Sequence, residues 1–318
     1  MAAAAERAAA DGRGYRHGPP WVFRGSALYQ LHLVKASTAR AFVPPGLRLV
    51  EAFGYTLGGM FLARYHDSPA GAFDELVVIA GIVWNPPTSC AVVYWWAARV
   101  LVNSVEACRH GRKEVGLPSH VATFSKMKPL VKSNNFLSMV GIGAAISRQG
   151  NGPEIEISET KGSSTKHLCR ISLPLTVNMW QQGHISTTGG WAQQSECRFQ
   201  ASVARNMNMT SFANFSGQTE DHPDLLKYSC QVECRVRPVK PAKIWSPRTT
   251  ETQETSLGKI SASGSSLLAE SDAQNQSISV LLSRPIFALE FSSLRMHVDA
   301  PKIVVPQCKT KKVRMSST

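Results

Sequence analysis

The chain lacks a long apolar segment and a regular cysteine framework. Its longest apolar runs, Leu76–Trp84 and Cys90–Ala98, have nine residues each, whereas a membrane-spanning helix needs about 20. The seven cysteines are widely spread and odd in number, which indicates reduced intracellular thiols rather than disulfides. We therefore expect an intracellular, soluble protein with no transmembrane segment. The cytosol is favoured over the plastid, because Glu6 and Asp11 interrupt an N-terminus that otherwise resembles a transit peptide.

Motifs for common cofactors and for nucleic acids are also absent. The chain has no dinucleotide-binding glycine fingerprint, no phosphate loop, no GxSxG and no HExxH. It has no RNP, zinc-finger or basic-zipper pattern, although its net charge is +13. Cys230 and Cys234 have a spacing found in zinc sites, but both fall on the apolar face of an expected strand, so we interpret them as core residues. We predict no cofactor, no metal and no nucleic-acid partner.

The remaining composition indicates a folded chain with a substantial core. Apolar residues make up 43% and charged residues 18% of the 318 residues, enough for one large domain or two ordinary ones. Short apolar runs separated by glycine and proline favour a sheet or barrel over alternating strands and helices. Alternation predicts strands at residues 27–35, with one buried face, and at 229–237. Further strands are expected at 278–282, 287–291 and 294–298.

These signals divide the chain into one domain with flexible ends. We expect disorder over residues 1–19, a single domain over residues 20–305 and a basic C-terminal tail over residues 306–318. Within the domain, residues 246–278 are rich in Ser, Thr, Glu and Gln and predict a flexible polar excursion.

One segment, Glu106–Pro118, suggests chemistry. It contains Lys113 beside Arg112 and before a Gly-Leu-Pro sequence. A lysine amine forms an imine with a ketone or aldehyde only when it is neutral, and burial or a neighbouring cation lowers its pKa toward that state. The alternative interpretation is a solvated basic loop, and the segment by itself leaves both open.

Three stretches resemble the acetoacetate decarboxylase superfamily: Pro20–Phe23, Phe42–Leu47 and Arg112–Pro118. The last of these is similar to the Lys-Lys-x-Gly-x-Pro motif of that superfamily. The resemblance implies a single α+β domain built around a cone-shaped, mostly antiparallel β-barrel with a few short helices. A barrel of this size holds one small ligand among its inward side chains.

A closer resemblance, from about Pro19 to Arg237, is to the plant neoxanthin-deficient family. Runs such as DSPAGAFDELVVIAGIVWNPPTSCA and EACRHGRKEVGLPS carry it. It implies a factor required to form neoxanthin, a xanthophyll upstream of abscisic acid, that is not itself the neoxanthin-forming catalyst. The barrel pocket would then bind a hydrophobic ligand. The alternative is a Schiff-base enzyme that uses Lys113 on a β-keto or aldehyde substrate. Either hypothesis requires a small hydrophobic or carbonyl ligand and leaves an oligomer open.

The superfamily resemblance gives Lys113 the imine-forming role, with Arg112 and Glu114 as its catalytic neighbours. Glu114 stands where the superfamily has a second lysine, and a nearby anion raises a lysine pKa rather than lowering it. Arg112 offers a positive charge from the preceding side. We therefore predict no decarboxylation of acetoacetate. Both functional hypotheses place the Lys113 amine inside a sheltered hollow walled by strands.

The same resemblance implies binding residues. The pocket arginine of the superfamily aligns with Gly25, one residue after Arg24, which makes Arg24 the candidate. Asp67 and Glu75 are the candidates for its pocket glutamate. The chain departs from the family pattern by four additional residues, Val92–Trp95, in an expected core strand. Such an insertion would shift the pairing register or form a bulge.

Overall fold

The computed structural model describes residues 15–84, 93–127, 152–162, 164–177, 207–246 and 264–304, without the side chains of residues 161 and 264–271. Its elements in chain order are β1 (Trp21–Lys35), α2 (Ala36–Arg40), β2 (Arg48–Leu49), β3 (Tyr55–Asp67), β4 (Phe73–Trp84), β5 (Val93–Val102), α3 (Val105–Glu114), β6 (Ser119–Met127), β7 (Glu154–Lys161), β8 (Ser164–Ser172), β9 (Met207–Gly217), β10 (Leu226–Val239), β11 (Lys243–Trp245), α7 (Gly264–Leu281), β12 (Arg284–Val298) and β13 (Lys302–Ile303).

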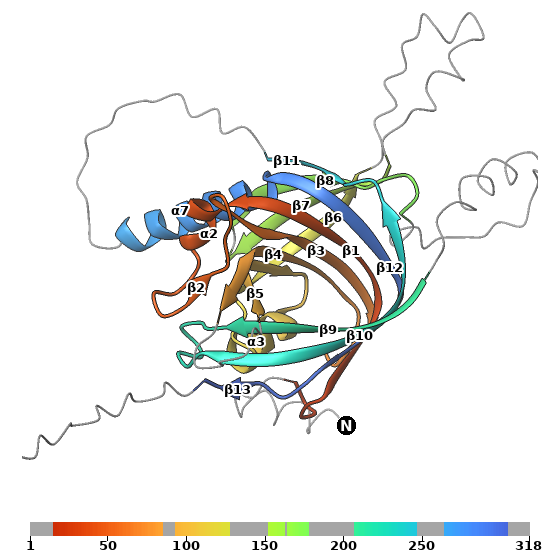
Figure 1. Ribbon diagram of the computed structural model, residues 1–318, viewed down its shortest axis with the longest axis horizontal. Helices are drawn as coiled ribbons and strands as arrows, with labels where there is room; N and C mark the ends of the chain where they lie inside the picture. Colours follow the sequence, from red (N-terminus) through yellow and green to blue (C-terminus); the bar gives the residue numbers. More distant parts are fainter. Residues whose placement is uncertain are drawn as a thin grey trace, which may run out of the picture.

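Seven of these strands close into a barrel (Figure 1). The sheet runs in the order β5-β9-β10-β12-β1-β3-β4, and a further pairing of β4 with β5 joins its two ends. These pairings are antiparallel except for the short parallel pairing of β5 with β9. The predicted mostly antiparallel barrel is therefore confirmed. Closure leaves these strands without a free edge and gives each of them an inward face.

Strand β5 is where a second sheet leaves the barrel. Its residues Trp95 and Trp96 pair with β9, whereas Val100–Val102 pair in parallel with β6. From β6 the sheet continues through β7 and β8 to β11 in antiparallel steps (Figure 1). Because β5 changes partner along its length, the second sheet diverges from the barrel and packs against its outer surface.

The barrel wall therefore separates two apolar cores. The inner core consists of the inward faces of the barrel strands together with residues of α3. The outer core lies between the outward faces of β1, β3, β4 and β5 on one side and β7, β8, α2 and α7 on the other. In β1, Phe23 and Ala27 belong to the inner core, and Leu28 and Val34 belong to the outer core. Because successive side chains of β1 point to opposite faces of the sheet, this one strand contributes residues to both cores.

The prediction that β1 has only one buried face is wrong. Gln30 and His32, on the face expected to meet water, are each 1% exposed. Their Nε2 atoms lie 2.9 Å apart, the Gln30 side chain exchanges hydrogen bonds with the backbone of Ala242, and His32 Nδ1 lies 3.3 Å from the carbonyl oxygen of Val280. Burial lowers the pKa of His32. These hydrogen bonds satisfy the polar groups, so α7 can cover this face.

Helix α7 also corrects the sequence expectation near the C-terminus. A flexible excursion was expected over residues 246–278 and a strand over 278–282, but Gly264–Leu281 is helical. Val280 packs fully buried in the outer core, and such tertiary packing stabilises a helix whose own sequence carries a weak signal. Neither α7 nor any other helix in the described part of the chain has the length and apolar character of a membrane span.

The strands expected at residues 287–291 and 294–298 are two halves of β12. Ser293 has a positive φ of 52°, and the pairing register of β12 shifts in this region. Such a bulge changes the phase of alternation. Leu289 before it and Met296 after it consequently both face the barrel interior.

The boundary expected at the N-terminus is also corrected. Disorder was expected over residues 1–19, but Tyr15 is buried and its ring stacks on that of His110, with the centroids 3.5 Å apart. Ordered structure therefore begins before the first strand. Residues 1–14 and the expected basic tail at 306–318 lie outside the described residues.

A buried ionic cluster joins the second sheet to the barrel. Arg99 of β5 pairs with Glu159 of β7, and their side chains are 6% and 9% exposed. His120 Nδ1 lies 3.0 Å from Glu159 Oε1, and Gln274 of α7 donates a hydrogen bond to Glu159 Oε2 at 3.0 Å. Burial alone would raise the pKa of Glu159, but the hydrogen bond from His120 and the charge of Arg99 lower it to about 2. The cluster thus ties α7 and the second sheet to β5.

We expect Arg99→Met to lower the free energy of unfolding by about 3 kcal/mol, because it leaves the Glu159 carboxylate buried without its main counterion. Urea denaturation at neutral pH measures this loss. Arg24→Met is the matched control, since the Arg24–Asp67 pair is 46% and 55% exposed and should contribute at most about 1 kcal/mol. Equal losses in the two variants would contradict the stabilising role of the cluster.

Candidate functional site

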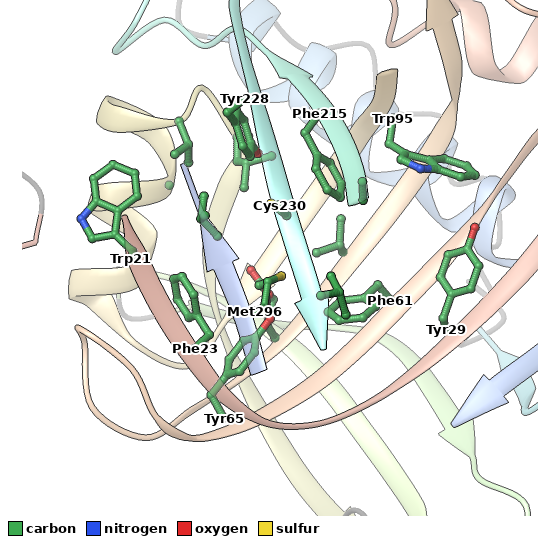
Figure 2. A pocket seen from close by; sticks show the side chains of 18 of the residues that line it. Trp21, Phe23, Tyr29, Phe61, Tyr65, Trp95, Phe215, Tyr228, Cys230 and Met296 are labelled. Atoms are coloured by element: carbon green, nitrogen blue, oxygen red, sulfur yellow. Dashed lines mark hydrogen bonds between the residues drawn. The ribbon is translucent and has the colours of Figure 1, made fainter. Parts of the chain in front are cut away.

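The barrel interior contains a cavity of about 460 Å³, within the size range of small-molecule sites. Each of the seven barrel strands contributes inward side chains to its wall, and residues of α3 contribute to one end. Figure 2 shows aromatic rings from β1, β3, β5, β9 and β10 gathered around it. The lining is therefore mostly apolar and rigid, as expected for a site that binds a hydrophobic molecule.

The cavity has a deep end and an open end. At the deep end the rings of Tyr15, Trp21, Phe23, Tyr65 and Tyr228 are buried. Other rings of the lining are only partly buried, namely Tyr29, Phe61, Trp95 and Phe215, and Phe212 is 69% exposed. In Figure 2, Trp21 and Trp95 lie at opposite ends of the labelled set. The lining is thus more accessible toward Trp95 than toward Trp21.

The rim of the open end includes exposed apolar side chains, with Lys35 opposite Tyr55 on the same face. Tyr55 and Leu57 continue the inward phase of β3, Val93 that of β5 and Phe287 that of β12. Their exposed fractions run from 37% to 42%. An apolar ligand can therefore meet hydrophobic surface before it reaches the interior.

One carboxyl group, Glu75 of β4, borders this aromatic cavity. The Tyr65 hydroxyl donates a hydrogen bond to Glu75 Oε2 at 2.9 Å. Burial raises the pKa of Glu75 to about 7, although the hydrogen bond from Tyr65 opposes the rise. Among the described lining residues there is no lysine or arginine. Glu75 is therefore a carboxyl group without a counterion that changes charge near neutral pH.

The other titratable groups that border the cavity stay neutral in that range. Burial lowers the pKa of His110 to about 3, and its Nδ1 accepts a hydrogen bond from the backbone N–H of Tyr15 at 3.1 Å. Burial raises the pKa of each phenol and thiol near the carboxyl group: Tyr15, Tyr65, Tyr228 and Cys230. In the described lining, the charge near pH 7 thus depends on Glu75.

Of the six site residues that the sequence singled out, Glu75 lines the cavity and the other five do not. Arg24 and Asp67 instead pair with each other at 2.5 Å on the exposed surface. The alignment had placed a pocket arginine at Gly25, where an added Cβ would lie 2.0 Å from the carbonyl oxygen of Arg64. Close packing of β1 on β3 therefore excludes any larger side chain at this position.

The expectation that Lys113 lies inside the cavity is wrong. Residues Val105–Glu114 form helix α3. Ala107, His110 and Gly111, at helical spacing, face the cavity. Lys113 lies on a different side of the helix, where it is exposed and does not contribute to the lining. The described cavity therefore offers no amine for an imine.

Arg112 and Glu114 also lie outside the lining. Arg112 forms an ion pair with Asp221, which precedes β10. Gly116 has a φ of 67°, and an added Cβ would lie 2.7 Å from the carbonyl carbon of Gly217 in β9. The stretch that carried the superfamily resemblance therefore fixes α3 against the barrel.

Sequence comparison shows the family. The chain is 68% identical over 317 residues to Protein NEOXANTHIN-DEFICIENT 1 of Oryza sativa subsp. japonica, covering 98% of this chain and 97% of that protein. The chain belongs to the NEOXANTHIN-DEFICIENT 1 family. The family member of Solanum lycopersicum is 50% identical over 295 residues, covering 90% and 92% of the two chains. No family model matches the chain.

Solved structures similar to this NEOXANTHIN-DEFICIENT 1 family member include acetoacetate decarboxylase from Legionella pneumophila. The TM-score is 0.48 at 12% identity, with 92% of this chain and 90% of that chain covered. The enduracididine biosynthesis enzyme MppR complexed with pyruvate gives a TM-score of 0.47 at 11% identity, with 90% and 91% covered.

One of the four additional residues of the sequence, Trp95, reaches the cavity. Val92 lies outside the described residues, but Val93 pairs with Trp84 and Trp95 pairs with Ile82, so the rest of the insertion begins β5. Trp95 lines the open end. Sequence reasoning did not assign Trp95 to the site, although its alternation with the buried Ala97 would have placed both on one face.

We expect Glu75→Gln to gain stability relative to wild type as the pH rises from 5 to 8. In wild type the folded-state pKa of about 7 lies above the ordinary value of 4.5. The stability from the bound proton is therefore present below pH 4.5 and lost as the pH rises through 7. Glutamine stays neutral at both pH values. The difference in free energy of unfolding between Glu75→Gln and wild type should therefore change by on the order of 3 kcal/mol from pH 5 to pH 8. Urea denaturation at both pH values measures it.

Glu233→Gln is the control for this experiment, because Glu233 is 41% exposed on the outer face of β10. The free energy of unfolding of Glu233→Gln should change with pH in the same way as that of wild type. Parallel pH profiles for Glu75→Gln and wild type would contradict the burial of a titrating carboxyl group in the barrel.

Proposed function

We propose that this protein is a factor for the formation of neoxanthin, upstream of abscisic acid, and that it acts by binding an apolar isoprenoid ligand in the barrel rather than by forming neoxanthin itself. Its membership of the NEOXANTHIN-DEFICIENT 1 family supports the pathway. The aromatic cavity without lysine or arginine in its described lining is the observation that supports ligand binding.

The chemistry of a xanthophyll matches this cavity. A xanthophyll is a stiff conjugated hydrocarbon chain with oxygen-bearing end rings, so it offers flat apolar faces to aromatic walls. A cavity of about 460 Å³ is too small for a whole pigment of this kind. The cavity would therefore hold one end ring and part of the chain, and the remainder would leave through the apolar rim formed by Tyr55, Leu57, Val93 and Phe287.

The position of Lys113 weighs against the Schiff-base alternative. An imine-forming lysine needs a shielded amine next to the bound carbonyl compound, whereas Lys113 is exposed and outside the described lining. The absence of an amine from that lining supports binding without imine chemistry and is consistent with no decarboxylation of acetoacetate.

We expect Ser211→Trp to abolish function, because an indole at this lining position of β9 would occupy much of the cavity. The test expresses variants in a plant line that lacks its own family member and measures neoxanthin by chromatography. Thr210→Trp is the matched control, since Thr210 is the exposed neighbour on the same strand. Wild type, the control and Lys113→Ala should restore neoxanthin.

Circular dichroism and melting curves of the purified proteins establish that both tryptophan variants fold. If the folded Ser211→Trp variant restored neoxanthin as well as wild type, the cavity would not be the functional site. Loss of function in Lys113→Ala, together with a borohydride-trapped adduct in wild type, would instead support the Schiff-base enzyme.

A further inference from the structure

Glu75 has hydrogen-bonding capacity that its described neighbours do not use. Tyr65 donates to Oε2 at 2.9 Å, and a carboxyl group has further lone pairs, and a proton when it is neutral, with which it can hydrogen-bond a ligand. The carboxyl group borders the cavity between buried aromatic rings at the deep end. In these apolar surroundings a ligand that forms a hydrogen bond with the Glu75 carboxyl group would be favoured over one that cannot.

The charges around Glu75 determine which ligands fit there. Without lysine or arginine in the described lining, an anionic ligand would meet no counterion and would be repelled by an ionised Glu75. A neutral carboxyl group can donate a hydrogen bond to a hydroxyl, epoxide or carbonyl oxygen, and either form can accept one from a hydroxyl. The other groups that face it from α3, β3, β10 and the segment before β1 stay neutral near pH 7: His110, Tyr65, Tyr228, Cys230 and Tyr15.

We propose that Glu75 recognises the oxygen-bearing end ring of the isoprenoid ligand through a hydrogen bond to the ring oxygen, while the hydrocarbon chain leaves past Tyr29 and Trp95. This inference rests on the proposed function and adds the class of end group and the direction in which the ligand lies. The rings of Tyr29 and Trp95 stand edge to face with their centroids 6.2 Å apart. They can therefore contact a flat conjugated chain at the exit.

The length of the barrel fits this orientation. Ile82 of β4 pairs with Trp95, and the strand from Glu75 to Ile82 spans roughly 20 Å at about 3.3 Å per residue. Phe61 and Phe291 lie along the cavity, with their centroids 6.3 Å apart. A ring bound at Glu75 would thus have an aromatic path for several conjugated double bonds before the rim.

The test compares zeaxanthin with β-carotene, which share one carbon skeleton and differ by the ring hydroxyl groups. Each is titrated into the purified full chain at pH 6, and binding is followed by quenching of tryptophan fluorescence. Wild type and Glu75→Gln should bind zeaxanthin roughly five- to tenfold more tightly than β-carotene, the value of one hydrogen bond. Glu75→Leu should lose the preference, and the Glu233→Gln control should retain it.

A pH series adds a second readout. β-Carotene has no group that can hydrogen-bond an ionised carboxylate, so its affinity for wild type should fall severalfold as the pH rises from 6 to 8.5. In Glu75→Gln the affinity should stay constant over the same range. A fall of the same size in both proteins would show that another group is responsible and would overturn the role of Glu75.

The remaining outcomes separate this inference from the proposed function. An equal preference for zeaxanthin in wild type and Glu75→Leu would overturn the inference and leave binding in the barrel intact. Tight binding of a quaternary ammonium probe that Glu75→Gln abolishes, without a preference between the carotenoids, would overturn it in favour of a cation site. If neither carotenoid bound wild type, both proposals would be overturned.

Discussion

The pairing of β4 with β5 is the interaction on which the rest of the structure depends, because it closes seven strands into a barrel. Closure gives these strands a shared interior, and the large aromatic side chains on their inward faces surround a cavity of about 460 Å³. The opposite edge of β5 carries the second sheet. One strand therefore contributes both to the aromatic cavity and to the outer core, because its side chains alternate between the two faces.

Two buried glutamates have opposite pKa shifts because their surroundings differ. Glu159 lies between the sheets with Arg99 and His120, and its pKa falls to about 2. Glu75 borders the aromatic cavity with only the Tyr65 hydroxyl as a described partner, and its pKa rises to about 7. The first carboxylate has the Arg99 guanidinium as counterion, which a stable internal ion pair requires. The second lacks a counterion in the described lining, a pattern that is common at sites that bind a ligand.

The sequence predicts the strands better than it predicts the site. Alternation correctly places Cys230 and Cys234 in the inner core, and the resemblance includes Glu75 among its candidates. The sequence prediction fails for Lys113, because the orientation of a lysine depends on whether its segment is a helix. In α3, Lys113 follows the cavity-lining Gly111 by two residues, about half a turn, and lies on the exposed side. Alternation also fails for His32. A polar residue in an alternating strand indicates a solvated face unless another element covers that face, and here α7 covers it.

Two independent observations support the proposed function. Family membership supports a role in neoxanthin formation, and the aromatic lining of the cavity supports binding of an apolar ligand. The most direct measurement is a crystal structure of the full chain grown with zeaxanthin. We expect one end ring inside the barrel, its oxygen within hydrogen-bond distance of the Glu75 carboxyl group, and the chain leaving beside Trp95. An empty barrel with the pigment bound on the outer surface would contradict the central claim.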